Sequence, residues 1–166
     1  MLFHISEQPG IQRFDPRPSD YTSESVVWAI HDDRLPNYLV PRDCPRVTFY
    51  ADEKTSDDDR RRFLGSSLAV IAVASEWEPI CRSTRLYCYE MPTESFICLD
   101  SCAGYFVSQQ SVEPVSVKAI EDPIAEITRR GFEFRVIGDL WTLHDQIISS
   151  TLRFSVIRMR NLTRPS

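Results

Sequence analysis

Leu2-Phe3-His4-Ile5-Ser6 is the first strand-like segment of this chain, and Val26-Val27-Trp28-Ala29-Ile30 is the second. Short apolar runs rich in β-branched and aromatic residues predict strands. A cleft that binds a nucleotide needs side chains that hydrogen-bond and side chains that stack on the base. Histidine and tryptophan on rigid strands can supply these two kinds of contact. The pair His4 and Trp28 is therefore the leading functional hypothesis, with packing in the core as the alternative for each residue.

Composition and charge narrow the class of protein. The chain has 166 residues, of which 42% are hydrophobic and 26% are charged, and this fits a single globular domain with a substantial core. It lacks an apolar stretch of about 18 residues, so we expect no membrane span. The formal charge of −5 disfavours a general nucleic-acid binder. The arginine-rich last strand is either a solvated face or a phosphate-binding patch.

Cysteine usage indicates the compartment. The five cysteines are odd in number and irregularly spaced, as expected of reduced thiols rather than of a disulfide framework. The sequence also begins without the basic and apolar regions of a secretory signal, so we expect a cytoplasmic protein. Cys98 and Cys102 could join a histidine around a metal ion, but the three histidines are scattered and we predict no metal site.

Hydrophobic periodicity predicts one mixed α+β domain. The strands are expected at residues 2–6, 26–30, 47–51, 68–74, 86–91, 96–99, 105–108, 132–136 and 152–156, with a further alternating segment around 115–118. The helices are expected at residues 32–39, from a Ser75 cap, between Asp122 and Gly131, and from Asp139 to 149. The short segment around Phe63 is expected to form a helical turn.

Familiar catalytic motifs do not occur in this sequence. The five glycines are scattered and form no phosphate-binding loop, and the HExxH, CxxC and GxSxG patterns are missing. The segment Pro41-Arg42-Asp43-Cys44-Pro45-Arg46 is the other noteworthy motif. Its two arginines could bind a diphosphate, or they could pair with nearby acidic residues. Its cysteine could be activated by the flanking arginines, with a buried structural thiol as the alternative.

Several segments together resemble the ADP-ribosyltransferase fold, especially the rifamycin-modifying type. The segments that carry this resemblance are residues 2–6, residues 26–30 leading into a helix, Leu86-Tyr87-Cys88-Tyr89-Glu90, and Gly104-Tyr105-Phe106-Val107-Ser108 followed by Glu113-Pro114-Val115. The resemblance implies a single α+β domain over 1–166, with a two-sheet core at 1–118 and a C-terminal α/β extension at 119–166. The whole chain also resembles a family of uncharacterised bacterial proteins that share segments 41–46 and 150–160.

The resemblance implies NAD as cofactor, bound between two sheets, and ADP-ribosyl transfer or a related nucleotide-directed reaction. In such enzymes a histidine on the first strand bonds the nicotinamide ribose and a tyrosine on the next strand stacks on nicotinamide. His4 matches in place, and Trp28 stands where tyrosine is expected. A late acid, here Asp100 or Glu113, would offset the positive charge that develops as the glycosidic bond breaks.

The candidate NAD-binding residues are His4, Ser6, Trp28, Arg42, Arg46 and Tyr105. The partner expected from these residues is a small-molecule nucleotide. A catalytically silent module that binds a ligand or a protein on the same fold is the alternative, because fold alone does not define function.

Overall fold

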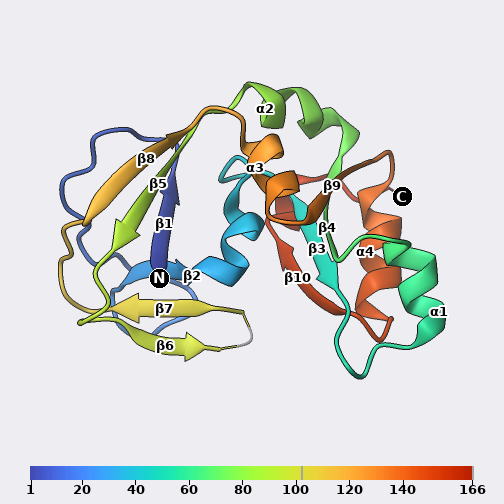
Figure 1. Cartoon of the computed structure of the whole chain (residues 1–166), viewed down its shortest axis with the longest axis horizontal. Coiled ribbons are helices and arrows are strands. Elements are labelled where there is room, and N and C mark those ends of the chain that lie inside the picture. Colours follow the sequence, from blue (N-terminus) through green and yellow to red (C-terminus); the bar gives the residue numbers. More distant parts are fainter. Residues whose placement is uncertain (102, 166) are drawn as a thin grey trace. The chain divides into compact units, whose positions relative to one another are not determined.

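The computed structural model describes residues 1–101 and 103–165, and the chain folds into two compact units (Figure 1). The first unit comprises residues 1–38 and 85–121, and the second comprises residues 39–84 and 122–166. Each unit is built on its own β-sheet, which confirms the α+β class with two sheets. The second unit therefore includes residues 39–84, which the sequence assigned to the core at 1–118.

The first unit contains a six-stranded antiparallel sheet with the strand order β6-β7-β2-β1-β5-β8. Its strands are β1 (Leu2–Ser6), β2 (Val27–His31), β5 (Leu86–Met91), β6 (Ile97–Asp100), β7 (Tyr105–Ser108) and β8 (Ser116–Ile120). The N-terminal strand β1 lies between β2 and β5, whereas β6 and β8 form the two edges of the sheet. Strand β1 thus joins the two halves of this sheet.

A buried hydrophobic cluster lies on one face of this sheet. The buried members of this cluster are Leu2, Val27, Ala29, Tyr89, Met91 and Val112. A 3₁₀ helix (Asp32–Tyr38) follows β2 where a helix was expected over 32–39. Pro36 lies inside it, and a proline has no N–H with which to continue an α-helical ladder. The tighter and shorter helix form is consistent with that missing donor.

The second unit contains a four-stranded sheet with the order β10-β3-β4-β9, in which β4 and β9 are parallel. Its strands are β3 (Arg46–Tyr50), β4 (Ala69–Ala74), β9 (Phe132–Ile137) and β10 (Arg153–Ile157). Its helices are α1 (Asp57–Asp59), α2 (Glu78–Ser83), α3 (Pro123–Arg129) and α4 (Leu140–Ile148), with a π-helical turn at Arg60–Leu64 and 3₁₀ turns at Ser75–Trp77 and Met159–Asn161. Every residue of β4 is buried, which explains its unbroken apolar sequence.

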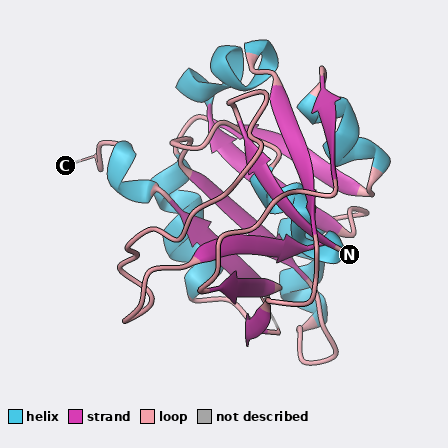
Figure 2. Ribbon diagram, turned by 90° about the vertical axis from the view of Figure 1, so that its left-hand side faces the viewer, coloured by secondary structure: helices cyan, strands magenta, loops and turns pink. Residues whose placement is uncertain are grey.

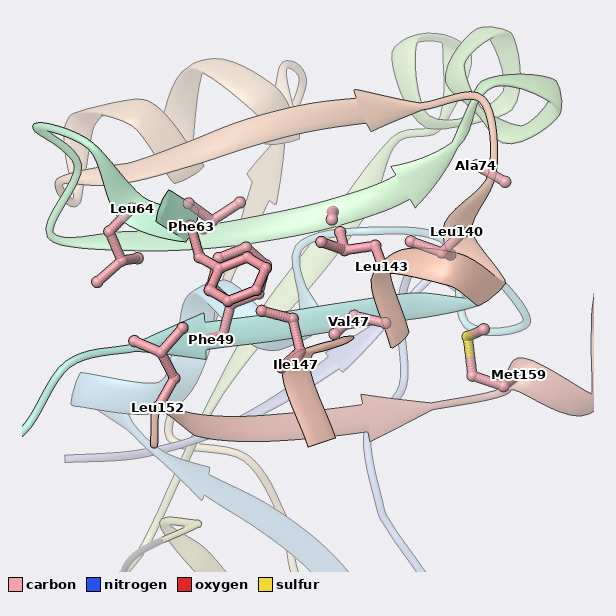
Figure 3. Packing of buried hydrophobic residues seen from close by; sticks show 12 residues of the cluster. Val47, Phe49, Phe63, Leu64, Ala74, Leu140, Leu143, Ile147, Leu152 and Met159 are labelled. Carbon is pink, nitrogen blue, oxygen red and sulfur yellow. The ribbon is translucent and has the colours of Figure 1, made fainter. Parts of the chain in front are cut away.

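Helix α4 packs its apolar stripe on β3 in the core of the second unit. Figure 3 shows Leu143 and Ile147 on the helix pointing toward Val47 and Phe49 on the strand, and all four belong to one buried cluster. The helix begins where Asp139 accepts a hydrogen bond from the Thr142 N–H at 3.0 Å. The expected start of this helix is therefore confirmed.

Two other expected helix boundaries have different outcomes. Asp122 accepts a hydrogen bond from the Ala125 N–H, and Gly131 adopts φ +83° after α3, so both ends of that helix are confirmed. The capping role expected of Ser75 is wrong. Ser75 is itself the first residue of the 3₁₀ turn, its predecessor Ala74 occupies the cap position, and α2 begins only at Glu78.

The helices of both units are short, as the cyan segments of Figure 2 show. Helix α4 has nine residues. Within the described residues, no helix is long and apolar enough to cross a membrane.

Two adjacent isoleucines of α4 provide a test of this packing. Ile147 is fully buried, whereas Ile148 is 44% exposed. We expect Ile147→Ala to lower the free energy of unfolding by about 2–5 kcal/mol, because it leaves a cavity against β3. Ile148→Ala should cost less than about 1 kcal/mol. Urea unfolding of both variants measures the difference, and equal losses would contradict the orientation of α4.

Candidate functional site

Strand register decides which candidate side chains share a surface in the first unit. Side chains alternate between the two faces along a strand, and residues paired across strands project to the same face. Phe3 of β1 pairs with Ile30 of β2, while the next residue, His4, pairs with Tyr89 of β5. Trp28 is two residues from Ile30 and shares the face of Phe3. The structure therefore does not bring the His4 and Trp28 side chains to one surface.

His4 makes a structural contact on its own face. Its Nδ1 lies 2.9 Å from the carbonyl oxygen of Trp28. A carbonyl oxygen can only accept, so His4 donates from Nδ1 and links β1 to β2. The half-buried imidazole packs on Phe14 with 4.6 Å between ring centroids. The Ser6 hydroxyl also makes a local contact, because it accepts a hydrogen bond from the Gln8 N–H at 3.0 Å.

A loop segment packs over the core on the His4 side of the sheet. Phe14 and Val112 form a two-residue bridge with backbone hydrogen bonds of 2.8 and 2.9 Å. The fully buried Tyr89 hydroxyl donates to the Gln8 carbonyl at 2.7 Å and accepts from the Ile11 N–H at 3.1 Å. These contacts hold the segment around residues 8–14 against the sheet.

A polar triad fixes the same segment to the loop after β7. The Asp15 carboxylate accepts hydrogen bonds from the Ser111 hydroxyl at 2.6 Å and from the Arg13 guanidinium at 2.8 Å. The Ser111 hydrogen bond, followed by that of Arg13, holds the pKa of Asp15 below its usual range. These contacts favour the charged carboxylate, so they weaken as the pH falls through the lowered pKa of the folded protein.

The opposite face carries four aromatic side chains, which we call the tyrosine–tryptophan cluster (Tyr21, Trp28, Tyr38 and Tyr105). Trp28 meets Tyr21 edge to face at a centroid distance of 6.4 Å and meets Tyr105 edge to face at 5.8 Å. Tyr38, at the end of the 3₁₀ helix, lies 6.5 Å from Tyr105. Tyr21 is 85% exposed and the other three are half-buried. The cluster thus presents aromatic surface to solvent on a rigid support.

Asp100 lies beside this cluster. It is the cross-strand partner of Tyr105, after a register shift between Cys98 and Asp100 in β6. Paired residues project to one face, so the Asp100 carboxylate shares the face of Tyr105 and Trp28. It is exposed, and one of its oxygens accepts a hydrogen bond from the Ala103 N–H at 2.9 Å.

Glu113 is placed differently. It is exposed in the segment between β7 and β8, directly after Val112. Val112 belongs to the buried core on the His4 side of the sheet. The strand register therefore associates Asp100, and not Glu113, with the aromatic cluster.

A hollow of about 480 Å³ continues from the cluster toward the edge strand β6. We call it the β6 hollow, and its lining residues are Tyr21, Thr22, Ser23, Glu24, Val26, Ser95, Ile97, Leu99, Val107, Gln109 and Gln110. Val107 pairs with both Trp28 and Ile97, which places all three on one face. Tyr21 contacts Trp28 and also lines the hollow. Apolar strand residues thus meet hydroxyl and amide groups beside the aromatic cluster.

The two arginines of segment 41–46 belong to the second unit and have different surroundings. Arg42 is exposed, whereas Arg46 is only 2% exposed and donates from its guanidinium to the Cys44 carbonyl at 2.9 Å. Burial of Arg46 leaves little of its side chain for an external diphosphate. Diphosphate binding by Arg42 stays a prediction.

The cysteines do not form a metal-binding group with other side chains in the part of the chain that the structure describes. Across residues 1–101 and 103–165, no group of three or more His, Cys, Asp or Glu side chains could hold a metal ion. Cys98 is exposed, and Cys102 lies outside the described residues.

Sequence reasoning identified Trp28, Tyr105 and Asp100 but missed the other members of the tyrosine–tryptophan cluster and of the β6 hollow. Tyr21 lies in an irregular segment and Tyr38 ends a helix, and neither position has a periodicity that assigns it to a face. The apolar residues Ile97 and Leu99 of β6 were the one signal in the sequence for the β6 hollow. A short apolar run of this kind predicts a buried strand equally well, so it does not indicate a binding surface.

These features define a mixed α+β protein with a partly exposed aromatic cluster on one of its two sheets. The chain belongs to a family of unknown function, DUF6886, whose model matches residues 3–162. No curated protein and no solved structure matches the chain.

The hydrogen bonds of the Tyr89 hydroxyl predict how firmly the segment around residues 8–14 is held against the sheet. Tyr89→Phe removes the hydroxyl that binds Gln8 and Ile11, so two backbone groups lose their partner. We expect a loss of about 1–3 kcal/mol in the free energy of unfolding, with faster amide exchange at Ile11. Tyr87→Phe, at a half-buried position on the same strand, is the control. Unchanged exchange at Ile11 in Tyr89→Phe would show that the segment is held by other contacts.

Proposed function

We propose that this protein binds NAD or a related dinucleotide on the tyrosine–tryptophan cluster and transfers its ADP-ribosyl group. The observation that carries the proposal is the position of Asp100, a carboxylate directly across from Tyr105 on the sheet face that holds Trp28. Stacking surface and negative charge thus occur together on rigid strands. The proposed partner is a small-molecule nucleotide, and the five cysteines still favour a cytoplasmic location.

The chemistry of glycosidic cleavage explains why these groups belong together. As nicotinamide leaves, positive charge develops on the ribose, and a nearby carboxylate stabilises that charge electrostatically. An aromatic ring can hold the planar nicotinamide by stacking while the bond breaks. In this proposal Trp28 and Tyr105 bind the base, and Asp100 stabilises the ribosyl cation.

The β6 hollow supplies groups suited to the rest of a nucleotide. Its serine, threonine and glutamine side chains can exchange hydrogen bonds with sugar hydroxyls. Val26 and Val107 provide apolar surface beneath them. A few polar groups placed around apolar surface are typical of small-molecule sites.

The register also assigns a different role to His4. Its Nδ1–H holds the carbonyl of Trp28, so it supports β2 from the opposite side of the sheet. His4 and Ser6 then act as positioning residues for the strand, and neither stacks on the ligand in this proposal.

A catalytically silent binding module is the second candidate. Ile97 is 71% exposed and Tyr21 is 85% exposed, and both line the β6 hollow. Exposed apolar side chains around a hollow favour binding of a partner or ligand whether or not a reaction follows. Ligand binding without release of nicotinamide would support this candidate over the transferase.

Thermal unfolding with NAD tests the binding proposal. Ligand at about one hundred times its dissociation constant adds on the order of 2.7 kcal/mol to the stability of the folded protein. We expect Trp28→Ala to remove most of this stabilisation and Trp28→Phe to retain part of it. His4→Ala, on the opposite face, is expected to lower the melting temperature without ligand and to keep the increment caused by NAD. No shift of the parent protein with millimolar NAD, ADP-ribose or nicotinamide would overturn the proposed site.

Release of nicotinamide from NAD tests the assignment of the acid. Asp100→Asn keeps an oxygen that can accept from the Ala103 N–H but removes the charge. We expect the rate of nicotinamide release to fall about a hundredfold or more in this variant. Glu113→Gln is the matched control, and its rate should equal that of the parent. Loss of activity in Glu113→Gln alone would assign catalysis to the other acid.

A further inference from the structure

Two buried thiols lie next to each other in the second unit. The Sγ atoms of Cys44 and Cys81 are 3.8 Å apart. Cys44 is fully buried and Cys81 is 1% exposed. The two residues are distant in sequence, because Cys44 precedes β3 and Cys81 lies in α2. The Pro41–Arg46 segment noted in the sequence therefore contributes one half of a dithiol.

The backbone around Cys44 is held firmly. Its N–H donates to the Pro41 carbonyl at 3.0 Å, and its own carbonyl accepts from the buried Arg46 guanidinium at 2.9 Å. Pro41 and Pro45 further restrict the segment, because each fixes its own φ angle. The thiol of Cys44 is thus presented to Cys81 by a segment with little freedom to turn away.

Electrostatics differ between the two thiols. The hydrogen bond between the two sulfurs, in which either can donate, lowers the pKa of Cys81. The same hydrogen bond, together with burial, raises the pKa of Cys44. The positive charge of Arg46 favours the thiolate at both positions. The lowered pKa of Cys81 favours this residue as the thiol that ionises and attacks.

We propose that Cys44 and Cys81 form a redox-active dithiol, which hydrogen peroxide converts to a disulfide between the Pro41–Arg46 segment and α2. The Cys81 thiolate attacks one peroxide oxygen and breaks the O–O bond, which gives a sulfenic acid and, after protonation, one water. The Cys44 sulfur then attacks the sulfenic sulfur, forms the S–S bond and loses its proton to the departing hydroxide as a second water. Two thiols are oxidised and one peroxide is reduced.

The geometry fits this reaction. A disulfide bond is about 2.0 Å long, so the two sulfurs must approach by about 1.8 Å from their present separation of 3.8 Å. Rotation of the two side chains and a small shift of α2 can provide that movement. The neighbouring thiol lies where it can condense with the sulfenic acid to give the disulfide. This inference concerns the second unit and does not depend on the nucleotide proposal.

Peroxide treatment of the full chain, followed by alkylation in denaturant and mass spectrometry, tests the proposal. The reduced protein has five cysteines available for alkylation. After a stoichiometric amount of hydrogen peroxide we expect two fewer alkylated sites, a mass decrease of about 2 Da in the unalkylated monomer, and a peptide pair joined through Cys44 and Cys81. The melting temperature should rise by on the order of 5 °C and return after reduction.

Variants separate this pair from the other thiols. Cys81→Ser and Cys81→Ala should abolish the linked peptide and the rise in melting temperature, whereas the exposed Cys98→Ser should preserve both. If either Cys81 variant fails to fold, the peptide map of the parent protein alone still decides the question. Alkylation of both Cys44 and Cys81 after peroxide treatment, or a linkage between other cysteines, would overturn the proposal.

Discussion

The pairing of β1 on both of its edges is the constraint on which the first unit depends. Phe3 pairs with Ile30 in β2, and His4 pairs with Tyr89 in β5, so a shift of one residue would exchange the two faces of the sheet. The hydrogen bond from His4 Nδ1 to the Trp28 carbonyl strengthens this register from one side. On that side the sheet carries a core and a packed loop segment. On the other side it carries the tyrosine–tryptophan cluster, the exposed carboxylate of Asp100, and the buried Val26 and Ile30.

The alternation of side chains along β3 likewise determines which residues are buried on each face of the second sheet. Val47 and Phe49 point toward α4, and the intervening positions of β3 point to the other face, where Arg46 and Thr48 are buried. A buried guanidinium needs acceptors, and Arg46 finds one in the Cys44 carbonyl. The restraint on the Cys44 backbone thus follows from the burial of Arg46. The segment 41–46, whose sequence suggested diphosphate binding, thus holds one of the two neighbouring thiols.

Much of the fold could be predicted because its elements have strong local patterns. The strand β9 and the Asp122 and Asp139 caps of α3 and α4 follow from nearby residues alone. The site could be predicted only in part, because it depends on register. His4 and Trp28 lie on consecutive strands, but the strand pairing, which no local pattern encodes, places their side chains on opposite faces. The approach of Cys44 to Cys81 likewise depends on packing between distant segments.

Fluorescence of Trp28 as the sole tryptophan tests the central claim most directly. The chain has three tryptophans. The double variant Trp77→Phe/Trp141→Phe retains only Trp28, which lies in the tyrosine–tryptophan cluster. Titration of this variant with NAD, followed by nicotinamide, should quench its emission in a saturable manner, because a stacked base contacts the indole directly. Saturable binding of NAD by calorimetry with no change in Trp28 emission would contradict the claim that the nucleotide binds on this face.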